Sequence, residues 1–256
     1  MIRLAKWLSC MAALAGAALL AAPPEARADL EVQISTDGGN SWTTIIDVAS
    51  GTTMTNVPGM NGSFSFLVLS ASSNSPGTSS SDALLSLDMQ FANGTSSTAT
   101  LDIRVSDVGF ISPGSGTDLE LTSGSSGTVS DNEGTAPNLS VDALTYQSYA
   151  DNSNTLFGTA GAATPGSQAA AFTPSADGLS AAFDSNASAD FSSTSNTYSM
   201  TETYAITLAG SNFVDFASTT DPTTPAPASM MMAFTAVPFL GLGAWLRRGR
   251  NQGGKV

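Results

Sequence analysis

Carboxylates and hydroxyls, not imidazoles, are the groups through which this sequence could do chemistry. The 256 residues contain 21 Asp and Glu but no His, so this chain cannot build a histidine triad, a histidine general base or a histidine-ligated metal. Asp102 could pair with Asp88 or Asp107 as the two carboxylates of a glycosidase. Nothing in the sequence distinguishes these three from the other acids. We therefore assign no catalytic residue and expect a protein that is not an enzyme.

One stretch has the composition of a site for a hard cation. Asp131, Asn132 and Glu133 stand before a glycine, and calcium prefers about six to eight oxygen ligands. The stretch supplies at most three side chains and lacks the ligand spacing of an EF-hand. We expect a solvated loop here, with calcium bound at Asp131 and Glu133 as the alternative and no other cofactor.

The segment STDGGNSW, from Ser35 to Trp42, resembles an Asp box, whose pattern is S-x-D-x-G-x-[ST]-W. Such boxes recur in sialidase-like β-propellers and in other β proteins. In this corner Asp37 can accept backbone N–H groups, Gly39 can adopt a positive φ and Trp42 can pack under the turn. The box occurs once, and no arginine cluster accompanies it to hold a carboxylated sugar. It therefore predicts a structural turn with a buried Trp42, and an exposed, sugar-stacking Trp42 is the alternative.

Charge is distributed unevenly along the chain. Residues 29–227 hold 20 acids and one base, Arg104, which gives this body a net charge of −19. Phosphate contacts need Lys and Arg, so nucleic acid is excluded as a partner and anionic lipid is disfavoured. We expect Arg104 to neutralise Asp102 or a neighbouring acid on a solvated sheet face rather than to hold a substrate.

The first 28 residues have the three parts of a secretory signal peptide. Two basic residues open it, the segment 7–22 is apolar, and Ala26 and Ala28 are the small residues that signal peptidase reads. We expect cleavage before Asp29. Cleavage removes Cys10, the one cysteine of the sequence, so the exported protein has no disulfide.

The chain ends in an apolar segment that is followed at once by bases. Residues 230–246 carry no charge, and a helix of that length spans about 25 Å, near the lower limit for crossing a bilayer. Arg247, Arg248 and Arg250 follow, and the positive-inside bias keeps them cytoplasmic. The expected layout is a signal peptide (1–28), a body (29–215), a Pro/Thr linker (216–229), a transmembrane helix (230–246) and a basic tail (247–256).

The order of motifs at this end resembles the PEP-CTERM protein-sorting tail. Pro225, Ala226 and Pro227 precede the apolar segment, a Gly-Leu-Gly lies within it and the arginines follow. Such tails occur on exported proteins of exopolysaccharide-producing, mostly Gram-negative bacteria and are thought to be recognised by exosortases. Ala226 stands where the family usually has Glu. The resemblance covers about residues 224–250. It implies an inner-membrane intermediate, processing by an exosortase-like enzyme, and delivery to the cell surface or extracellular matrix.

Between its two ends the chain shows short runs of alternating apolar and polar residues, the pattern of half-buried strands. One run begins at Leu85 and another at Ala99, and no stretch of the body sustains a helical period. Several such runs separated by turn residues predict an all-β body, an antiparallel β-sandwich or jelly-roll. Long Ser/Gly-rich loops are expected, among them 112–135 and 184–197. A largely disordered acidic chain is the alternative.

The most specific structural expectation concerns residues 84–105. Asn93-Gly94 favours a two-residue hairpin turn, but that register would place inward side chains opposite outward ones. An odd loop such as 93–95 restores the parity and sets Leu87 opposite Leu101. We therefore expect a hairpin with a three- or five-residue loop and one buried face.

Two functions fit these observations. The first is a non-enzymatic cell-surface or matrix protein that associates with extracellular polysaccharide. The second is a carbohydrate-binding, lectin-like or carbohydrate-active sandwich module, with Trp42, Tyr146 and Tyr149 as the sugar contacts. A flat exposed row of aromatic rings, Tyr198 included, would favour the second function, and burial of these rings would favour the first.

Overall fold

The computed structural model describes residues 29–49, 53–54, 59–77, 83–111, 118–131 and 135–224. The signal peptide, the sorting tail and its apolar segment, and Glu133 lie outside these residues. A helix with the length and apolar character needed to cross a bilayer is not found within the described ranges.

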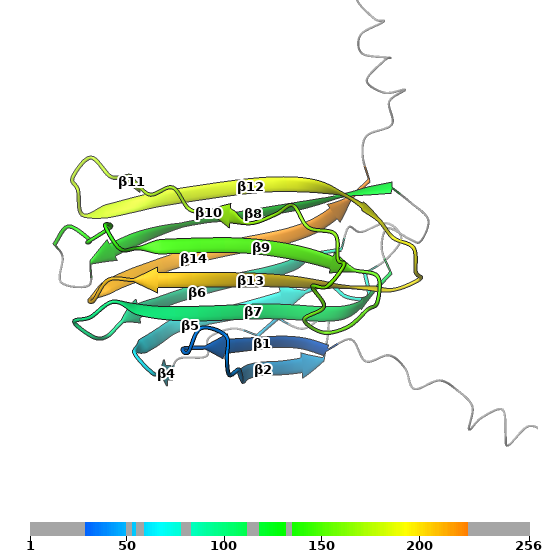
Figure 1. Ribbon diagram of the computed structural model, residues 1–256, viewed down its shortest axis with the longest axis horizontal. Helices are drawn as coiled ribbons and strands as arrows, with labels where there is room; N and C mark the ends of the chain where they lie inside the picture. The colour runs from blue at the N-terminus through cyan, green and yellow to red at the C-terminus, as the bar shows by residue number, and fades with distance from the viewer. Residues whose placement is uncertain are drawn as a thin grey trace, which may run out of the picture. The chain divides into compact units, whose positions relative to one another are not determined.

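Two antiparallel sheets make up the body (Figure 1). The first has the strand order β10-β9-β13-β7-β1-β2. Its strands are β1 (Asp29–Ser35), β2 (Thr43–Ala49), β7 (Ala99–Phe110), β9 (Ala143–Asp151), β10 (Gln168–Ala169) and β13 (Tyr198–Leu208). The second has the order β11-β12-β8-β14-β6-β5-β3, with β4 paired to β5. Its strands are β3 (Thr53–Met54), β4 (Gly59–Asn61), β5 (Phe64–Ser73), β6 (Leu85–Asn93), β8 (Asp118–Asp131), β11 (Thr173–Pro174), β12 (Ser180–Ser192) and β14 (Asn212–Thr223).

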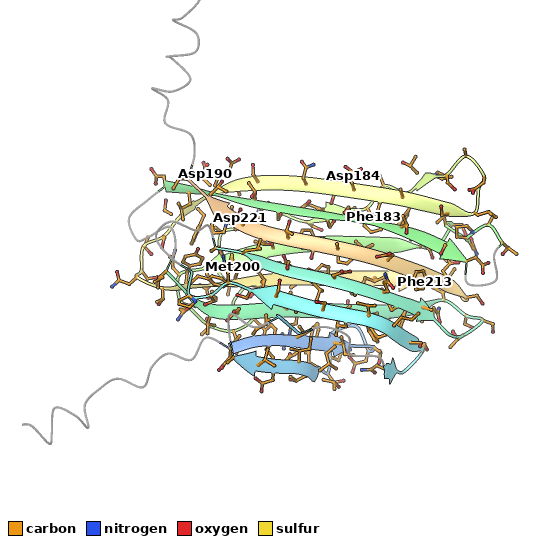
Figure 2. All side chains as sticks on the ribbon, turned by 180° about the vertical axis from the view of Figure 1, so that it is seen from behind. Phe183, Asp184, Asp190, Met200, Phe213 and Asp221 are labelled. Carbon is orange, nitrogen blue, oxygen red and sulfur yellow. The ribbon has the colours of Figure 1, made fainter. Side chains whose placement is uncertain are left out.

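The two sheets face each other (Figure 1). Alternate side chains of each sheet fill the space between them, and Figure 2 draws the side chains on the ribbon. Leu101 and Ile103 enter this core from β7, and Leu87 and Met89 enter it from β6, each at most 1% exposed. The outer face of the eight-stranded sheet is polar, and Figure 2 labels Asp184 and Asp190, both exposed, on it. The prediction of an all-β antiparallel body is confirmed.

The predicted hairpin over residues 84–105 is wrong in its pairing. β6 and β7 belong to different sheets, so Leu87 pairs with Ala71 and Ser218, whereas Leu101 pairs with Ile206. The side-chain amide of Asn93, 1% exposed, lies at this crossing. It donates to the carbonyl oxygens of Ser97 (2.8 Å), Leu208 (3.1 Å) and Ala209 (3.1 Å), which holds two crossings between the sheets side by side. The burial of Leu87 and Leu101 was predicted correctly, but they lie on opposite sheets.

The two Ser/Gly-rich stretches expected as loops are largely the strands β8 and β12, which pair along the whole of β12. Near the ends of these strands the side chains that point into the core are apolar, such as Leu121 and Phe183. In the middle of the strands the side chains that point inward include serines. The amide of Gln168 meets these serines, donating to Ser123 Oγ (2.7 Å) and accepting from Ser185 Oγ (3.1 Å). Internal hydrogen bonds therefore take the place of apolar contacts in this part of the core.

The expected boundary of the body at residue 215 is also wrong. Strand β14 continues to Thr223 and lies between β8 and β6. Its inward residues Phe216, Ser218 and Thr220 are buried. The run of threonines that suggested a linker is therefore an interior strand, because β14 has ladder partners on both sides.

A carboxyl group lies inside the sandwich beside hydroxyl groups. Glu202 on β13 is 0% exposed. It accepts hydrogen bonds from Thr220 (2.6 Å), Ser218 (3.0 Å) and Tyr146 (3.2 Å), and also from Tyr204. The body's single base lies on the outer face, so no cation of the described residues neutralises this site. Burial raises the pKa of Glu202, and the four hydrogen bonds only partly oppose that effect.

Replacing Leu101 by Ala should lower the free energy of unfolding by about 2–5 kcal/mol, because it leaves a cavity between the sheets. Thr100→Ala is the control. Thr100 is exposed on the same strand, so its loss should cost well under about 1 kcal/mol. Chemical denaturation measures both, and equal losses would contradict the placement of β7.

Replacing Glu202 by Gln should remove one pH-dependent contribution to stability. A raised pKa in the folded state means that Glu202 stabilises the fold when protonated and that this contribution is lost as pH rises through the folded pKa. The stability of Glu202→Gln relative to wild type should therefore increase from pH 4 to pH 8, as measured by denaturation at each pH. Glu120→Gln, in a strand on the other sheet, controls for the loss of one charge. A Glu202→Gln difference that is flat with pH would refute the prediction.

Candidate functional site

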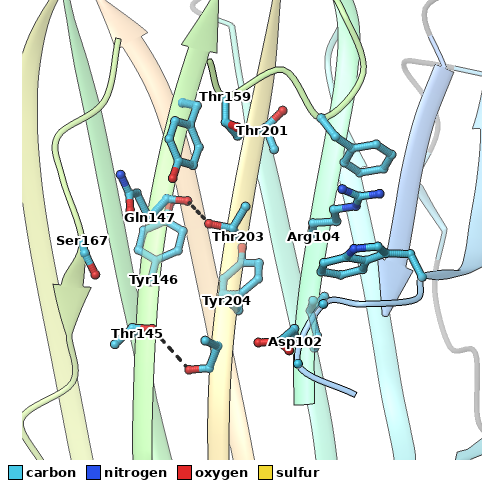
Figure 3. Close-up of a pocket in the computed structure, with 17 residues that line it drawn as sticks. Asp102, Arg104, Thr145, Tyr146, Gln147, Thr159, Ser167, Thr201, Thr203 and Tyr204 are labelled. Carbon is cyan, nitrogen blue, oxygen red and sulfur yellow. Dashed lines mark hydrogen bonds between the residues drawn. The ribbon is translucent and has the colours of Figure 1, made fainter. Parts of the chain in front are cut away.

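A cleft of about 390 Å³ lies on the outer face of the six-stranded sheet (Figure 3). Thr201, Thr203 and Ala205 of β13 line it from the middle of the sheet, because they alternate with the inward residues of that strand. On one side stand Gln147 and Tyr149 of β9. On the other side stand residues of β7, the β1–β2 turn and the loop after β9, namely Asp102, Arg104, Trp42 and Phe157.

Arg104 is held between two aromatic rings. Its guanidinium carbon lies 4.2 Å from the centroid of Trp42 and 4.2 Å from the centroid of Phe157, within the range of a cation–π contact. Its Nε donates to Gln33 Oε1 (2.8 Å), and Nη2 donates to the same oxygen. The acceptor of these hydrogen bonds is a neutral amide and not Asp102, and the neighbouring acid whose charge acts on Arg104 is Glu31. Burial lowers the pKa of Arg104, and Glu31 opposes that shift.

The Asp-box turn fixes Trp42 beside Arg104. The N–H of Ser41 donates to Asp37 Oδ1 (2.9 Å), and its hydroxyl donates to Asp37 Oδ2 (2.5 Å). These bonds and one from Ser35 lower the pKa of Asp37 to about 2. Gly39 has a φ of 79°, and a Cβ there would lie 3.6 Å from the Trp42 ring. The predicted turn is thus confirmed, although Trp42 is half-buried and not fully covered.

The loop after β9 supplies Phe157, which sequence reasoning missed. Asp151 organises this loop by accepting from the N–H of Ser153 (2.9 Å) and the hydroxyl of Thr155 (2.9 Å). Burial alone would raise the pKa of Asp151, but these hydrogen bonds lower it. Phe157 itself has a φ of 57°, and its N–H donates to Ser106 Oγ (3.0 Å). A non-glycine residue at positive φ carries no sequence signal, which is why the position could not be found earlier.

The polar side chains of the cleft differ in whether they hydrogen-bond to other groups of the protein. Gln147 donates to Thr164 Oγ1 (3.0 Å), and Thr203 donates to the carbonyl of Gln147 (3.3 Å; Figure 3). Asp102 is half-buried. Its pKa is raised by burial first and by the charge of Asp37 second, with no hydrogen bond opposing the shift. Asp102 thus offers the cleft an acceptor that has no hydrogen-bond donor among the described residues.

The predicted sugar-contact residues separate into two groups. Tyr149 and Trp42 line the cleft and are half-buried. Tyr146 also borders the cleft, but Tyr146 and Tyr198 are 0% and 1% exposed, with rings in the core, so the prediction of Tyr146 as a sugar contact is wrong. The ring of Tyr146 stacks on Tyr204 with centroids 5.3 Å apart. No flat row of exposed rings exists among these four aromatic residues.

The carboxylates considered for catalysis or calcium are dispersed. Asp107 is 0% exposed, and Asp88 is on the eight-stranded sheet, so neither reaches Asp102 in the cleft. Asp131 ends β8 and accepts a hydrogen bond from Thr135. Asn132 and Glu133 lie outside the described residues. Within the part of the chain that the structure describes, no three metal-ligating side chains converge.

No protein-family model matches the chain, and no curated protein matches it. Among solved structures, it is similar to the K1 cleaved adhesin domain of Lys-gingipain from Porphyromonas gingivalis W83, with 10% identity and a TM-score of 0.28 over 69% of this chain and 100% of that domain. It is also similar to TmCBM27, a carbohydrate-binding module studied for specific mannan recognition, with 12% identity and a TM-score of 0.27 over 60% of this chain and 84% of that module.

Proposed function

We propose that the chain is an exported, non-enzymatic protein of the cell surface or extracellular matrix whose body binds glycan in the outer-face cleft. The observation that carries the proposal is the cleft itself, in which aromatic side chains and polar groups, Asp102 and Gln147 among them, meet over the small residues of β13. Its volume of about 390 Å³ lies in the range of ligand sites, about 300–1,000 Å³.

A glycan matches the chemistry of this cleft. Sugar rings combine apolar C–H faces with hydroxyls that both donate and accept hydrogen bonds. Asp102 can accept, Gln147 can do both, and the ring of Tyr149 can cover a C–H face. One face of Trp42 is covered by Arg104, so that face is not available to a sugar ring.

Export and sorting are part of the same proposal and rest on the two ends of the sequence. Signal peptidase would release residues 1–28, and an exosortase-like enzyme would process the tail near Pro225 and Pro227 while residues 230–246 hold the chain in the inner membrane. The body's 20 acids and one base keep it soluble outside the cell. Its glycan partner would be the extracellular polysaccharide that surrounds the cell.

Replacing Ala205 by Phe should lower glycan affinity by about tenfold or more, because a ring on the cleft floor fills the space that the ligand needs. Ala217→Phe is the matched control. Ala205 and Ala217 are both exposed alanines on central strands, but Ala217 lies on β14 of the other sheet. Binding to immobilised extracellular polysaccharide and to a panel of oligosaccharides measures the effect. Equal affinity of the two variants, or no binding by the wild type, would refute glycan binding in the cleft.

The intact mass of the protein recovered from the medium should correspond to a chain that begins at Asp29 and ends between about residues 224 and 230. Deleting residues 225–256 should abolish sorting, because it removes the motif, the apolar segment and the bases together. A secreted species that still ends at Val256 would contradict processing. Retention of the uncleaved chain in the membrane would indicate a plain single-span anchor.

A further inference from the structure

The positive and negative groups around the cleft differ in how accessible they are to a ligand. Arg104 is the one base in residues 29–227. Two of its nitrogens donate to Gln33, and both of its faces are covered by the rings of Trp42 and Phe157. The cation that would neutralise a ligand carboxylate is therefore largely engaged within the protein.

The negative charge of the cleft, in contrast, is available. Asp102 is half-buried, lines the cleft on the same side as Arg104, and has no hydrogen-bond donor among the described residues (Figure 3). Asp37 in the adjoining turn adds a second negative charge near it. A half-buried carboxylate without donors is incompletely solvated, so it gains from a ligand that brings O–H groups to it.

We propose that Asp102 makes the cleft selective for an uncharged, hydroxyl-rich glycan and against one that carries carboxylates. This inference rests on the proposed glycan binding and adds the class of ligand. Hydroxyls of a neutral sugar donate to Asp102, which gives charge-assisted hydrogen bonds. A uronate at the same position places a carboxylate against Asp102 in a partly desolvated site, and like charges held together in this way disfavour the wrong partner. Arg104 keeps its positive charge, but Gln33 and the two rings hold two of its nitrogens and both of its faces, so it makes fewer contacts with that carboxylate than an unengaged guanidinium would.

The test compares neutral hexose oligosaccharides with the same oligosaccharides oxidised at C6 to carboxylates, using the full-length protein. The wild type should bind a neutral member about tenfold or more tightly than its oxidised form. In Asp102→Asn the affinity for the oxidised form should rise and the ratio should approach one. Asp88→Asn is the matched control. It removes one negative charge from the exposed outer face of the other sheet, so it should leave the wild-type ratio unchanged.

The outcomes separate the two proposals. If the wild type binds no oligosaccharide of either kind, glycan binding in the cleft fails and the selectivity fails with it. If neutral and oxidised forms bind the wild type equally, the selectivity is refuted while glycan binding stands. The same conclusion follows if Asp102→Asn and Asp88→Asn change the ratio alike, because the repulsion would then come from the body's overall charge. Circular dichroism and thermal unfolding of each variant verify that the fold is retained.

Discussion

The outer face of the six-stranded sheet depends on the position of one cation. Arg104 connects neighbouring strands through Gln33, which is its cross-strand partner on β1. Through Trp42 and Phe157 it also connects two loops that are more than a hundred residues apart in the sequence. Because every other base of the sequence lies outside residues 29–227, no second cation in the body could take its place. Arg104 thus holds one wall of the cleft together through contacts within the protein.

The core has to be closed by a chain that is poor in large apolar residues. One part is apolar, where β6 and β7 face each other with Leu87, Met89, Leu101 and Ile103. Another part is polar, where Gln168 joins serines of β8 and β12 and where hydroxyls surround Glu202. Buried polar groups usually need hydrogen-bond partners of defined geometry, so these bonds constrain the relative positions of the strands that they join.

Alternation in the sequence identified which side chains are buried but not which strands pair. Side chains alternate between the two faces of a strand whichever strand it pairs with. Two strands that face each other across a sandwich therefore show the same period of two in the sequence as two strands paired in one sheet. At residues 84–105 the two strands join different sheets, and the buried amide of Asn93 between them donates to Leu208 and Ala209, which are far away in the chain. For β8 and β12 the composition favoured loops because Ser and Gly are common in turns, yet ladder partners on adjacent strands made them strands. Burial was therefore readable from local pattern, whereas pairing depended on contacts that only the folded chain brings together.

The residues of the cleft also divide into those that a local pattern predicts and those that only the folded chain brings together. The Asp box is a local motif, so the turn that holds Trp42 could be predicted from its eight residues. Phe157, in contrast, has a positive φ, which its residue type does not indicate. Strand β13 unites the two sides of the sheet, because Thr201 and Thr203 line the cleft while Glu202 between them enters the core. A change in the protonation of Glu202 would act on the hydroxyls that position this strand from within. The cleft floor and the polar part of the core are thus consecutive residues of one strand, and the shape of the first depends on the hydrogen bonds of the second.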